Sequence, residues 1–215
     1  NGGPFISTKN DKKWLMRSTI PAVKKPIKTL RGCDLFSGCG GITLGLFEAC
    51  RSHQMELEMV MACDLFPAAK TSYEHNFKPT YFLENPIEEY IDGELGEKPT
   101  QKEIDLMNKL GEINVVVGGP PCQGNSNLNN HTRRNDPRNE LYMRMIRFVE
   151  LFTPNIVLIE NVRDVVKNTQ NVVPRAIETL NKLGYSVGNG VVKGHFIGVP
   201  QTRTRHFTVA VMDSL

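Results

Sequence analysis

The chain has 215 residues, of which 40% are hydrophobic and 23% charged. This composition supports one domain with a sizeable core, excludes a disordered or collagen-like chain, and contains no apolar run near the ~18 residues of a membrane span. Five cysteines without a CxxC pair argue against a disulfide framework or a zinc finger. We therefore expect a soluble protein of a reducing, intracellular compartment.

Positive charge is concentrated in the first part of the chain. The net charge is +3, but residues 1–29 hold seven basic residues against Asp11, so this segment contributes +6 and the remainder −3. Weak periodicity and three prolines predict that residues 1–29 form a basic arm, with one short helix near Trp14, and that residues 30–215 form the folded core. The arm could follow a phosphate backbone or be a solvated extension, and charge alone does not decide.

After the arm, short apolar runs alternate with longer amphipathic stretches. Strands are predicted at residues 30–36, 57–63, 113–118, 155–159, 186–192 and 206–212. Helices are predicted at residues 42–51, 67–77, 101–110, 140–152 and 172–183. The alternation indicates an α/β fold with a doubly wound, mainly parallel sheet covered on both faces. Residues 90–112 are expected to be a surface excursion, and the polar residues 123–139 a long loop.

Ligands of such sheets bind outside the carboxyl ends of the strands. The first strand runs into a glycine turn at residues 37–41, but Thr43 breaks the dinucleotide fingerprint G-x-G-x-x-G. This argues against an NAD enzyme and leaves room for a nucleoside cofactor without a pyrophosphate. Asp64 closes the second strand, where a carboxylate can accept both ribose hydroxyls, and Leu65 and Phe66 could flank an adenine. Asp64 could also N-cap the helix that follows.

The residues after the run 113–118 carry the strongest chemical signal. Two glycines and two prolines lead directly to Cys122. Because prolines fix φ and remove N–H donors, the cysteine would lie on a rigid elbow at the mouth of the sheet. A thiolate is the strongest nucleophile among ordinary side chains. A lone cysteine is more often a small buried side chain, but this position favours a nucleophile.

Four sequence blocks resemble signature blocks of the C5-cytosine DNA methyltransferases. They are Asp34-Leu35-Phe36-Ser37-Gly38-Cys39-Gly40-Gly41, Gly119-Pro120-Pro121-Cys122-Gln123-Gly124, Glu160-Asn161-Val162 and Gln201-Thr202-Arg203-Thr204-Arg205, in the family's order. The resemblance covers about residues 30–212 and implies the Rossmann-like fold of class I S-adenosylmethionine-dependent methyltransferases. It also implies that a cytosine is flipped out of double-stranded DNA and methylated at C5 from S-adenosylmethionine.

The chemistry of that reaction explains the residue types in these blocks. Cytosine C5 is too weak a nucleophile to attack a sulfonium methyl group, and addition of the Cys122 thiolate at C6 makes C5 enamine-like. Glu160 would protonate or hydrogen-bond N3 and so relieve the added negative charge. Arg203 and Arg205 alternate along an extended segment, so both could face one side and hold the cytosine O2, the nucleophile loop or a phosphate.

The resemblance also assigns a cofactor pocket and a lid. The residues expected to contact S-adenosylmethionine are Phe36, Gly38, Cys39, Gly40, Asp64, Leu65, Asn85, Gly119, Pro121 and Leu141. Asn85 stands where the family usually has an acid for the adenine amino group, and its carbonyl can still accept that hydrogen bond. The loop would be a mobile lid over the flipped base. Its expected DNA-contacting residues are Gln123, Ser126, His131, Arg133, Arg134 and Arg138.

Two parts of the family pattern have no counterpart in this sequence. These are a target-recognition region and a final segment that completes the cofactor pocket, so we expect a truncated catalytic core that alone binds cofactor weakly and methylates poorly. We further expect a monomer that uses no metal and no membrane, in a bacterial cytoplasm or nucleoid or a eukaryotic nucleus. A tRNA cytosine-5 methyltransferase and a catalytically idle binding module remain alternatives. The recognised DNA sequence and a role in restriction-modification stay open.

Overall fold

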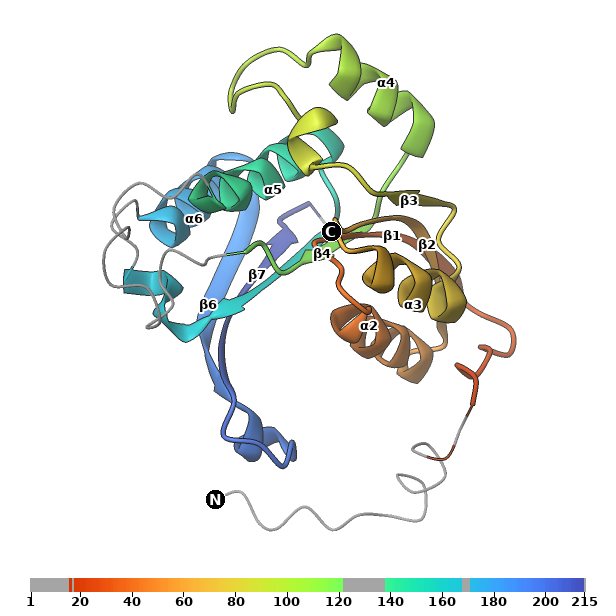
Figure 1. Ribbon diagram of the computed structural model, residues 1–215. Helices are drawn as coiled ribbons and strands as arrows, with labels where there is room; N and C mark the ends of the chain where they lie inside the picture. Colours follow the sequence, from red (N-terminus) through yellow and green to blue (C-terminus); the bar gives the residue numbers. More distant parts are fainter. Residues whose placement is uncertain (1–15, 17, 122–137, 168–170, 215) are drawn as a thin grey trace.

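The computed structural model describes residues 16, 18–121, 138–167 and 171–214 (Figure 1). Its centre is a seven-stranded sheet with the strand order β3-β2-β1-β4-β5-β7-β6. The strands are β1 (Lys28–Leu35), β2 (Met55–Cys63), β3 (Tyr81–Leu83), β4 (Val115–Gly118), β5 (Ile156–Val162), β6 (Tyr185–Lys193) and β7 (Thr204–Met212). Strands β1 to β5 are parallel, and β7 runs antiparallel to both of its neighbours. The predicted mainly parallel α/β sheet is confirmed.

The helices follow the predicted amphipathic stretches. They are α2 (Gly41–Ser52), α3 (Pro67–Phe77), α4 (Gln101–Leu110), α5 (Arg138–Phe152) and α6 (Val172–Lys182), with single 3₁₀ turns η1 (Ile87–Glu89), η3 (Arg163–Lys167) and η4 (Gly194–Ile197). For α3 and α4 the predicted bounds are correct. Within the described part of the chain, no helix combines the length and the hydropathy that a membrane crossing requires.

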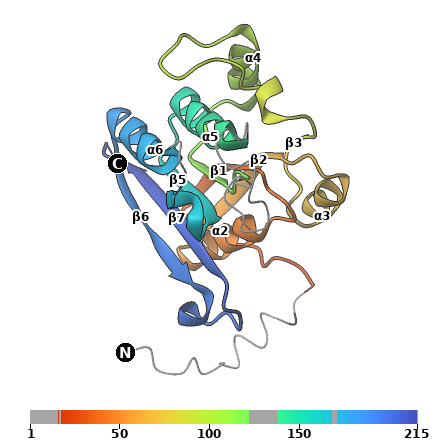
Figure 2. The same cartoon turned by 60° about the vertical axis from the view of Figure 1, so that its left-hand side comes forward.

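Side-chain alternation divides the core into two layers. Val116 and Ile159 belong to the larger cluster, with residues of α5 and α6, whereas Val115 and Val117 pack with residues of α2. Because successive residues of a strand point to opposite faces, these strands are apolar on both sides, as expected for a buried parallel sheet. Figures 1 and 2 show α5 and α6 on one face of the sheet and α2 and α3 on the other.

Coverage of the second face is incomplete among the described residues. Helix α2 packs against β1, β2 and β4, and the same face continues over β5 and β7 with Ile156, Val209 and Val211, all of which are exposed. The register places Ile156 opposite Val211, so these side chains form one apolar strip. The expected helices are therefore present on both faces, but in the described part of the chain α2 and α3 leave the β5–β7 part of the second face uncovered.

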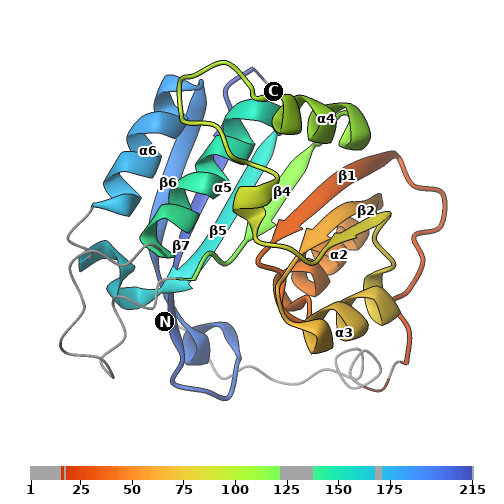
Figure 3. The same ribbon diagram turned by 45° about the horizontal axis from the view of Figure 1, so that its top comes forward.

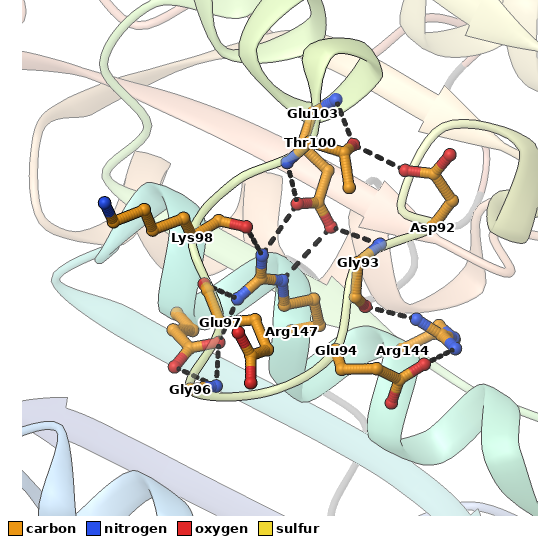
Figure 4. A network of polar contacts seen from close by, with 11 residues as sticks. Asp92, Gly93, Glu94, Gly96, Glu97, Lys98, Thr100, Glu103, Arg144 and Arg147 are labelled. Atoms are coloured by element: carbon orange, nitrogen blue, oxygen red, sulfur yellow. Dashed lines mark hydrogen bonds and ion pairs between the residues drawn. The ribbon is translucent and has the colours of Figure 1, made fainter.

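Residues 90–112 were predicted to be a surface excursion, but several of their side chains are buried in the core. Ile91, Leu106 and Leu110 are buried in the main core. Glu103 on α4 forms a 2.7 Å ion pair with Arg147 on α5, and these side chains are 0% and 2% exposed (Figure 4). The Glu103 carboxylate also accepts the backbone N–H groups of Gly93 and Thr100. Hydrogen bonds of Glu103 to Arg147 on α5 and to the backbone of the excursion thus hold residues 90–112 against the core.

Candidate active site

Several candidate residues follow the carboxyl ends of the parallel strands, and backbone hydrogen bonds join those ends. The Ser37 N–H donates to the Cys63 carbonyl over 2.9 Å, and the Asp64 N–H donates to Leu83 over 3.2 Å. The Gly119 N–H donates to Leu35 over 3.3 Å. The turns that follow β1, β2 and β4 are therefore neighbours, as the position of a site in a parallel sheet predicts.

The turn between β1 and α2 has an unusual backbone. Phe36, Gly38 and Gly40 all have positive φ, at 61°, 53° and 87°. A positive φ is strained for a residue with a Cβ, and such strain is concentrated at functional sites. Gly40 also has no room for a side chain, because a Cβ there would lie 2.1 Å from the ring of Phe77. The glycine turn is thus fixed both by its dihedral angles and by close packing against α3.

Asp64 connects the end of β2 to this turn. Its Oδ2 accepts the Gly38 N–H at 2.8 Å and its Oδ1 accepts the Phe66 N–H at 3.0 Å. The N-cap residue of α3 is Phe66, whose own side chain makes no capping hydrogen bond, so the alternative in which Asp64 is the N-cap is wrong. Instead, the carboxylate lies beside the glycine turn, and its predicted contact with a ribose stays a prediction.

The other predicted cofactor residues follow the ends of the strands or lie on α5, and they differ in exposure. Leu65 and Phe66, which follow Asp64, are 58% and 74% exposed. Asn85 follows β3 and is exposed, and its backbone carbonyl accepts the Cys63 thiol. Cys39 is exposed, and Leu141 on α5 is half-buried against the main core. The exposed pair is available to flank a planar ring.

The segment after β4 packs closely on the two strands beside it. A Cβ at Gly118 would lie 2.5 Å from the Leu35 carbonyl oxygen, so β4 and β1 require glycine at this point. The Pro120 carbonyl accepts the side-chain N–H of Asn161 at 2.8 Å. Pro121 is the last described residue before the predicted nucleophile. The Gly-Gly-Pro-Pro segment is therefore attached to the end of β5.

Glu160 and Arg205 form an ion pair next to that segment. The Arg205 Nε lies 2.8 Å from Glu160 Oε1, and both side chains are about three-quarters buried, at 23% and 22% exposure. The position of a Cβ at Gly119 lies 3.4 Å from Glu160 Oε2. Strand β5 continues to Val162 rather than ending at residue 159 as predicted, because β7 pairs with it through Val162 and Arg205. This pairing places the arginine beside the glutamate.

Arg203 is separated from this pair. It precedes the first residue of β7 and is exposed, whereas Arg205 lies within the strand. The Arg203 carbonyl accepts the Gly194 N–H at 2.8 Å and closes the β6–β7 connection. The structure thus assigns different surroundings to two arginines that the alternation pattern had treated together.

Several predicted residues lie outside the described part of the chain. They are Cys122, Gln123, Ser126, His131, Arg133 and Arg134. Arg138 is the first residue of α5, but its side chain is also outside the description. Their roles as nucleophile, lid and DNA contacts stay predictions.

A buried polar network behind the glycine turn was missed at the level of the sequence. The Asp34 carboxylate at the end of β1 accepts the hydroxyl of Thr43 on α2, which in turn hydrogen-bonds the hydroxyl of Tyr73 on α3. Burial raises the pKa of Asp34 from 3.8 to about 7, the Thr43 hydrogen bond opposes this shift, and the negative charge of Asp64 adds to it. Asp34 belongs to the first signature block, but nothing in the pattern indicates Tyr73.

Comparison with known proteins identifies the family to which this geometry belongs. The family model of the C-5 cytosine-specific DNA methylases matches residues 30–215. The Type II methyltransferase M1.BsuMI of Bacillus subtilis (strain 168) is 42% identical over 200 residues, which cover 93% of this chain and 47% of the relative. DNA (cytosine-5)-methyltransferase 1 of Rattus norvegicus is 31% identical over 200 residues, covering 88% of this chain and 11% of the relative. The chain spans at most about half the length of these curated relatives.

Solved structures agree with this assignment. A DNA modification methyltransferase encoded within an E. coli prophage matches with a TM-score of 0.66 at 27% identity, over 86% of this chain and 47% of that chain. The S. pombe Dnmt2 methyltransferase shares the fold with a TM-score of 0.62 at 22% identity, over 86% of this chain and 51% of that chain. The expected class I methyltransferase fold is confirmed. The protein belongs to the C-5 cytosine-specific DNA methylase family.

Proposed function

We propose that the protein is a DNA (cytosine-5-)-methyltransferase that transfers a methyl group from S-adenosylmethionine to C5 of a flipped cytosine. One observation carries this proposal. The segment that leads into Cys122 is hydrogen-bonded to Asn161, and the neighbouring Glu160 is paired with Arg205, so three of the four signature blocks converge at one edge of the sheet. Membership of the family supports the same reaction.

The residues at the ends of β1 and β2 fit S-adenosylmethionine. Among the described residues, no atom lies within 4 Å of a Cβ position at Gly38, so the turn has open space at its surface. Asp64 would bind the ribose, and the exposed side chains of Leu65 and Phe66 would flank the adenine. The other proposed contacts are Phe36, Cys39, Gly40, Asn85, Gly119, Pro121 and Leu141. When bound, the cofactor supplies an electrophilic methyl group.

The residues of the chain prepare cytosine to accept that group. The Cys122 thiolate forms a bond to C6, which places the electron pair of the C5–C6 double bond in an enamine that N3 stabilises by taking a proton from Glu160. Arg205 holds Oε1 of Glu160, so the carboxyl group is oriented before the base arrives. After C5 carries the methyl group, a water molecule takes the C5 proton and the thiolate leaves C6, while N3 returns its proton to Glu160, which restores the neutral aromatic ring. Arg203 and the lid residues would hold DNA phosphates.

Transfer of radiolabel tests the reaction. Purified protein is incubated with labelled S-adenosylmethionine and either unmethylated DNA or tRNA, and the labelled nucleoside is identified. The variants are Cys122→Ser, which removes the nucleophile, and Glu160→Gln, which keeps the size and removes the acid. The longest protein that the gene encodes is assayed in parallel, because the relatives are longer than this chain.

The proposal predicts label in 5-methyldeoxycytidine, no label with Cys122→Ser, and a loss of about 100-fold or more with Glu160→Gln. Binding of S-adenosylmethionine, measured by calorimetry, should be the same in both variants. Label in tRNA alone would establish the tRNA methyltransferase instead. No label from either the chain or the longest product would favour the idle binding module.

A further inference from the structure

The connection between β6 and β7 projects beyond the sheet on the side of the candidate active site. Strand β5 pairs with β7 only as far as Arg205, whereas β6 pairs up to Thr204, so residues 193–203 (called the tip) lie past the end of β5. Figures 1 and 3 show this tip extending past the carboxyl ends of the central strands. Since Arg205 contacts Glu160, the tip begins next to the proposed catalytic pair.

Backbone hydrogen bonds give the tip a defined shape. The Gly194 N–H donates to Arg203 over 2.8 Å, and the Val199 N–H donates to Gly194 over 3.0 Å. Gly194 is buried, and a Cβ there would lie 3.3 Å from the carbonyl oxygens of Gln201 and Arg203. The side chains of the tip are therefore presented from an ordered backbone.

An aromatic ring and cations are exposed together on this tip. Phe196 is 71% exposed, and Ile197 and Val199 beside it are also exposed. The Lys193 Nζ lies 5.4 Å from the centroid of the Phe196 ring, and the His195 ring packs edge-on against it at 4.3 Å. A single exposed apolar side chain is ordinary, but neighbouring exposed apolar side chains such as Phe196, Ile197 and Val199 are typical of a surface that contacts a partner.

The charge of the tip identifies the kind of partner. From Lys193 to Met212 the sequence contains no Asp or Glu. The charge of Arg205 is balanced by Glu160, but Lys193 and Arg203 are exposed and positive. An apolar protein surface would complement the ring and would leave these cations without a counterpart. A nucleic acid complements both, since phosphates bind the cations and sugars and base edges contact the ring.

We propose that the tip contacts the DNA duplex beside the candidate active site, with Lys193 on a phosphate and the Phe196 ring in a groove, in addition to the phosphate contact already proposed for Arg203. The proposal rests on the proposed function, because it takes DNA as the substrate. It adds a DNA-binding element to the lid and the base-binding residues. Its position past the carboxyl ends of the strands would extend the duplex-binding surface from the catalytic pair onto the β6–β7 hairpin.

Binding of a short fluorescein-labelled duplex, followed by anisotropy in about 50 to 200 mM salt, tests the proposal. The variants are Lys193→Ala, Phe196→Leu and Phe196→Tyr. Lys182→Ala is the matched control. This lysine is exposed at the end of α6, close to the first residue of β6, and the tip follows the other end of that strand. Thermal unfolding of each variant checks that the fold is intact.

We expect Lys193→Ala to weaken binding and to lower the slope of log K against log salt by about 1, while Lys182→Ala changes neither. Phe196→Leu should weaken binding about 5-fold or more, and Phe196→Tyr should retain it, because the ring rather than its apolar area contacts the DNA. Unchanged binding in Lys193→Ala and Phe196→Leu, or no binding to the duplex at about 50 mM salt, would overturn the proposal. Tip-dependent binding without methylation would overturn the proposed function alone.

Discussion

Single residues determine whether the glycine turn can approach α3. Gly40 combines a φ of 87° with a Cβ position 2.1 Å from the ring of Phe77. That ring cannot move away easily, because it also packs on Phe47 and Tyr73 at centroid distances of 5.7 and 4.8 Å. The backbone of the proposed cofactor site therefore depends on aromatic packing between α2 and α3.

Replacement of Gly40 by alanine should lower the free energy of unfolding by about 2 to 4 kcal/mol, from the left-handed backbone and the overpacked ring together. Urea denaturation measures this change. The control is Gly45→Ala on the exposed side of α2, where no described atom lies within 4 Å of the new Cβ. Because alanine has the higher helix propensity, this variant should raise the free energy of unfolding by up to about 1 kcal/mol. Equal stability of the two variants would show that Phe77 yields at little cost.

At the scale of elements, the sequence predicts those units whose pattern is long enough to be periodic. The helices α3 and α4 were predicted with their bounds, whereas β3 has only three residues and no alternation to detect. The end of β5 was predicted three residues early, because Glu160 and Asn161 interrupt the apolar run and only the pairing with β7 keeps them in the strand.

The candidate site shows the same limit. The signature blocks predicted that Glu160 and Arg205 belong to one site, because each block resembles a family pattern. Their direct ion pair depends on the register of β5 with β7, which a pattern within either segment does not contain. The Asn161 hydrogen bond to Pro120 and the pairing of Glu103 with Arg147 were also missed, because each joins two segments that are far apart in the sequence.

The pair Glu103–Arg147 determines how the excursion is attached. Burial would raise the pKa of Glu103, but the Arg147 guanidinium and the backbone N–H groups of Thr100 and Gly93 outweigh it and hold that pKa below its usual range. Arg147 also donates to the Glu97 carbonyl and to Glu150 (Figure 4). One arginine thus joins α5 to α4 and to the loop that precedes α4.

Arg147→Met should cost about 3 to 5 kcal/mol of unfolding free energy, because it leaves the Glu103 carboxylate buried without its cation. Hydrogen exchange should accelerate at residues 91–112 before other parts of the chain. The double variant Glu103→Gln/Arg147→Met should recover part of the loss, because it removes the buried charge. The recovery should be incomplete, since the Gly93 and Thr100 N–H groups bind different oxygens of Glu103 and glutamine keeps only one acceptor oxygen. Lys182→Ala, which breaks the exposed pair with Glu178, should cost no more than about 0.5 kcal/mol. A similar cost for both single variants would contradict the buried-pair interpretation.

At the scale of the whole molecule, the two faces of the sheet differ in completeness. The face under α5 and α6 is covered, while Ile156, Val209 and Val211 remain exposed on the other. The chain spans 47% of the B. subtilis relative. The described helices form one complete layer and one partial layer, and the candidate site lies at the carboxyl ends of the parallel strands, where the glycine turn packs against α3.

At this scale, two buried groups with opposite pKa shifts contribute in opposite directions to the pH dependence of stability. Burial raises the pKa of Asp34 to about 7, so between its ordinary value of 3.8 and about 7 the folded chain retains a proton that the unfolded chain has lost. Stability from this group is therefore lost as the pH rises through that window. Burial lowers the pKa of His206, so its contribution is lost as the pH falls below 6.5.

Asp34→Asn isolates the first of these effects. The amide stays neutral at every pH and its oxygen still accepts the Thr43 hydroxyl. The variant should match the native chain near pH 4 and become more stable than it as the pH rises to 8, with a difference of a few kcal/mol at the upper end. Urea denaturation across this range measures the difference, and Asp105→Asn on the exposed side of α4 is the control. A difference that stayed constant with pH would mean that Asp34 has the same pKa in the folded and unfolded chains.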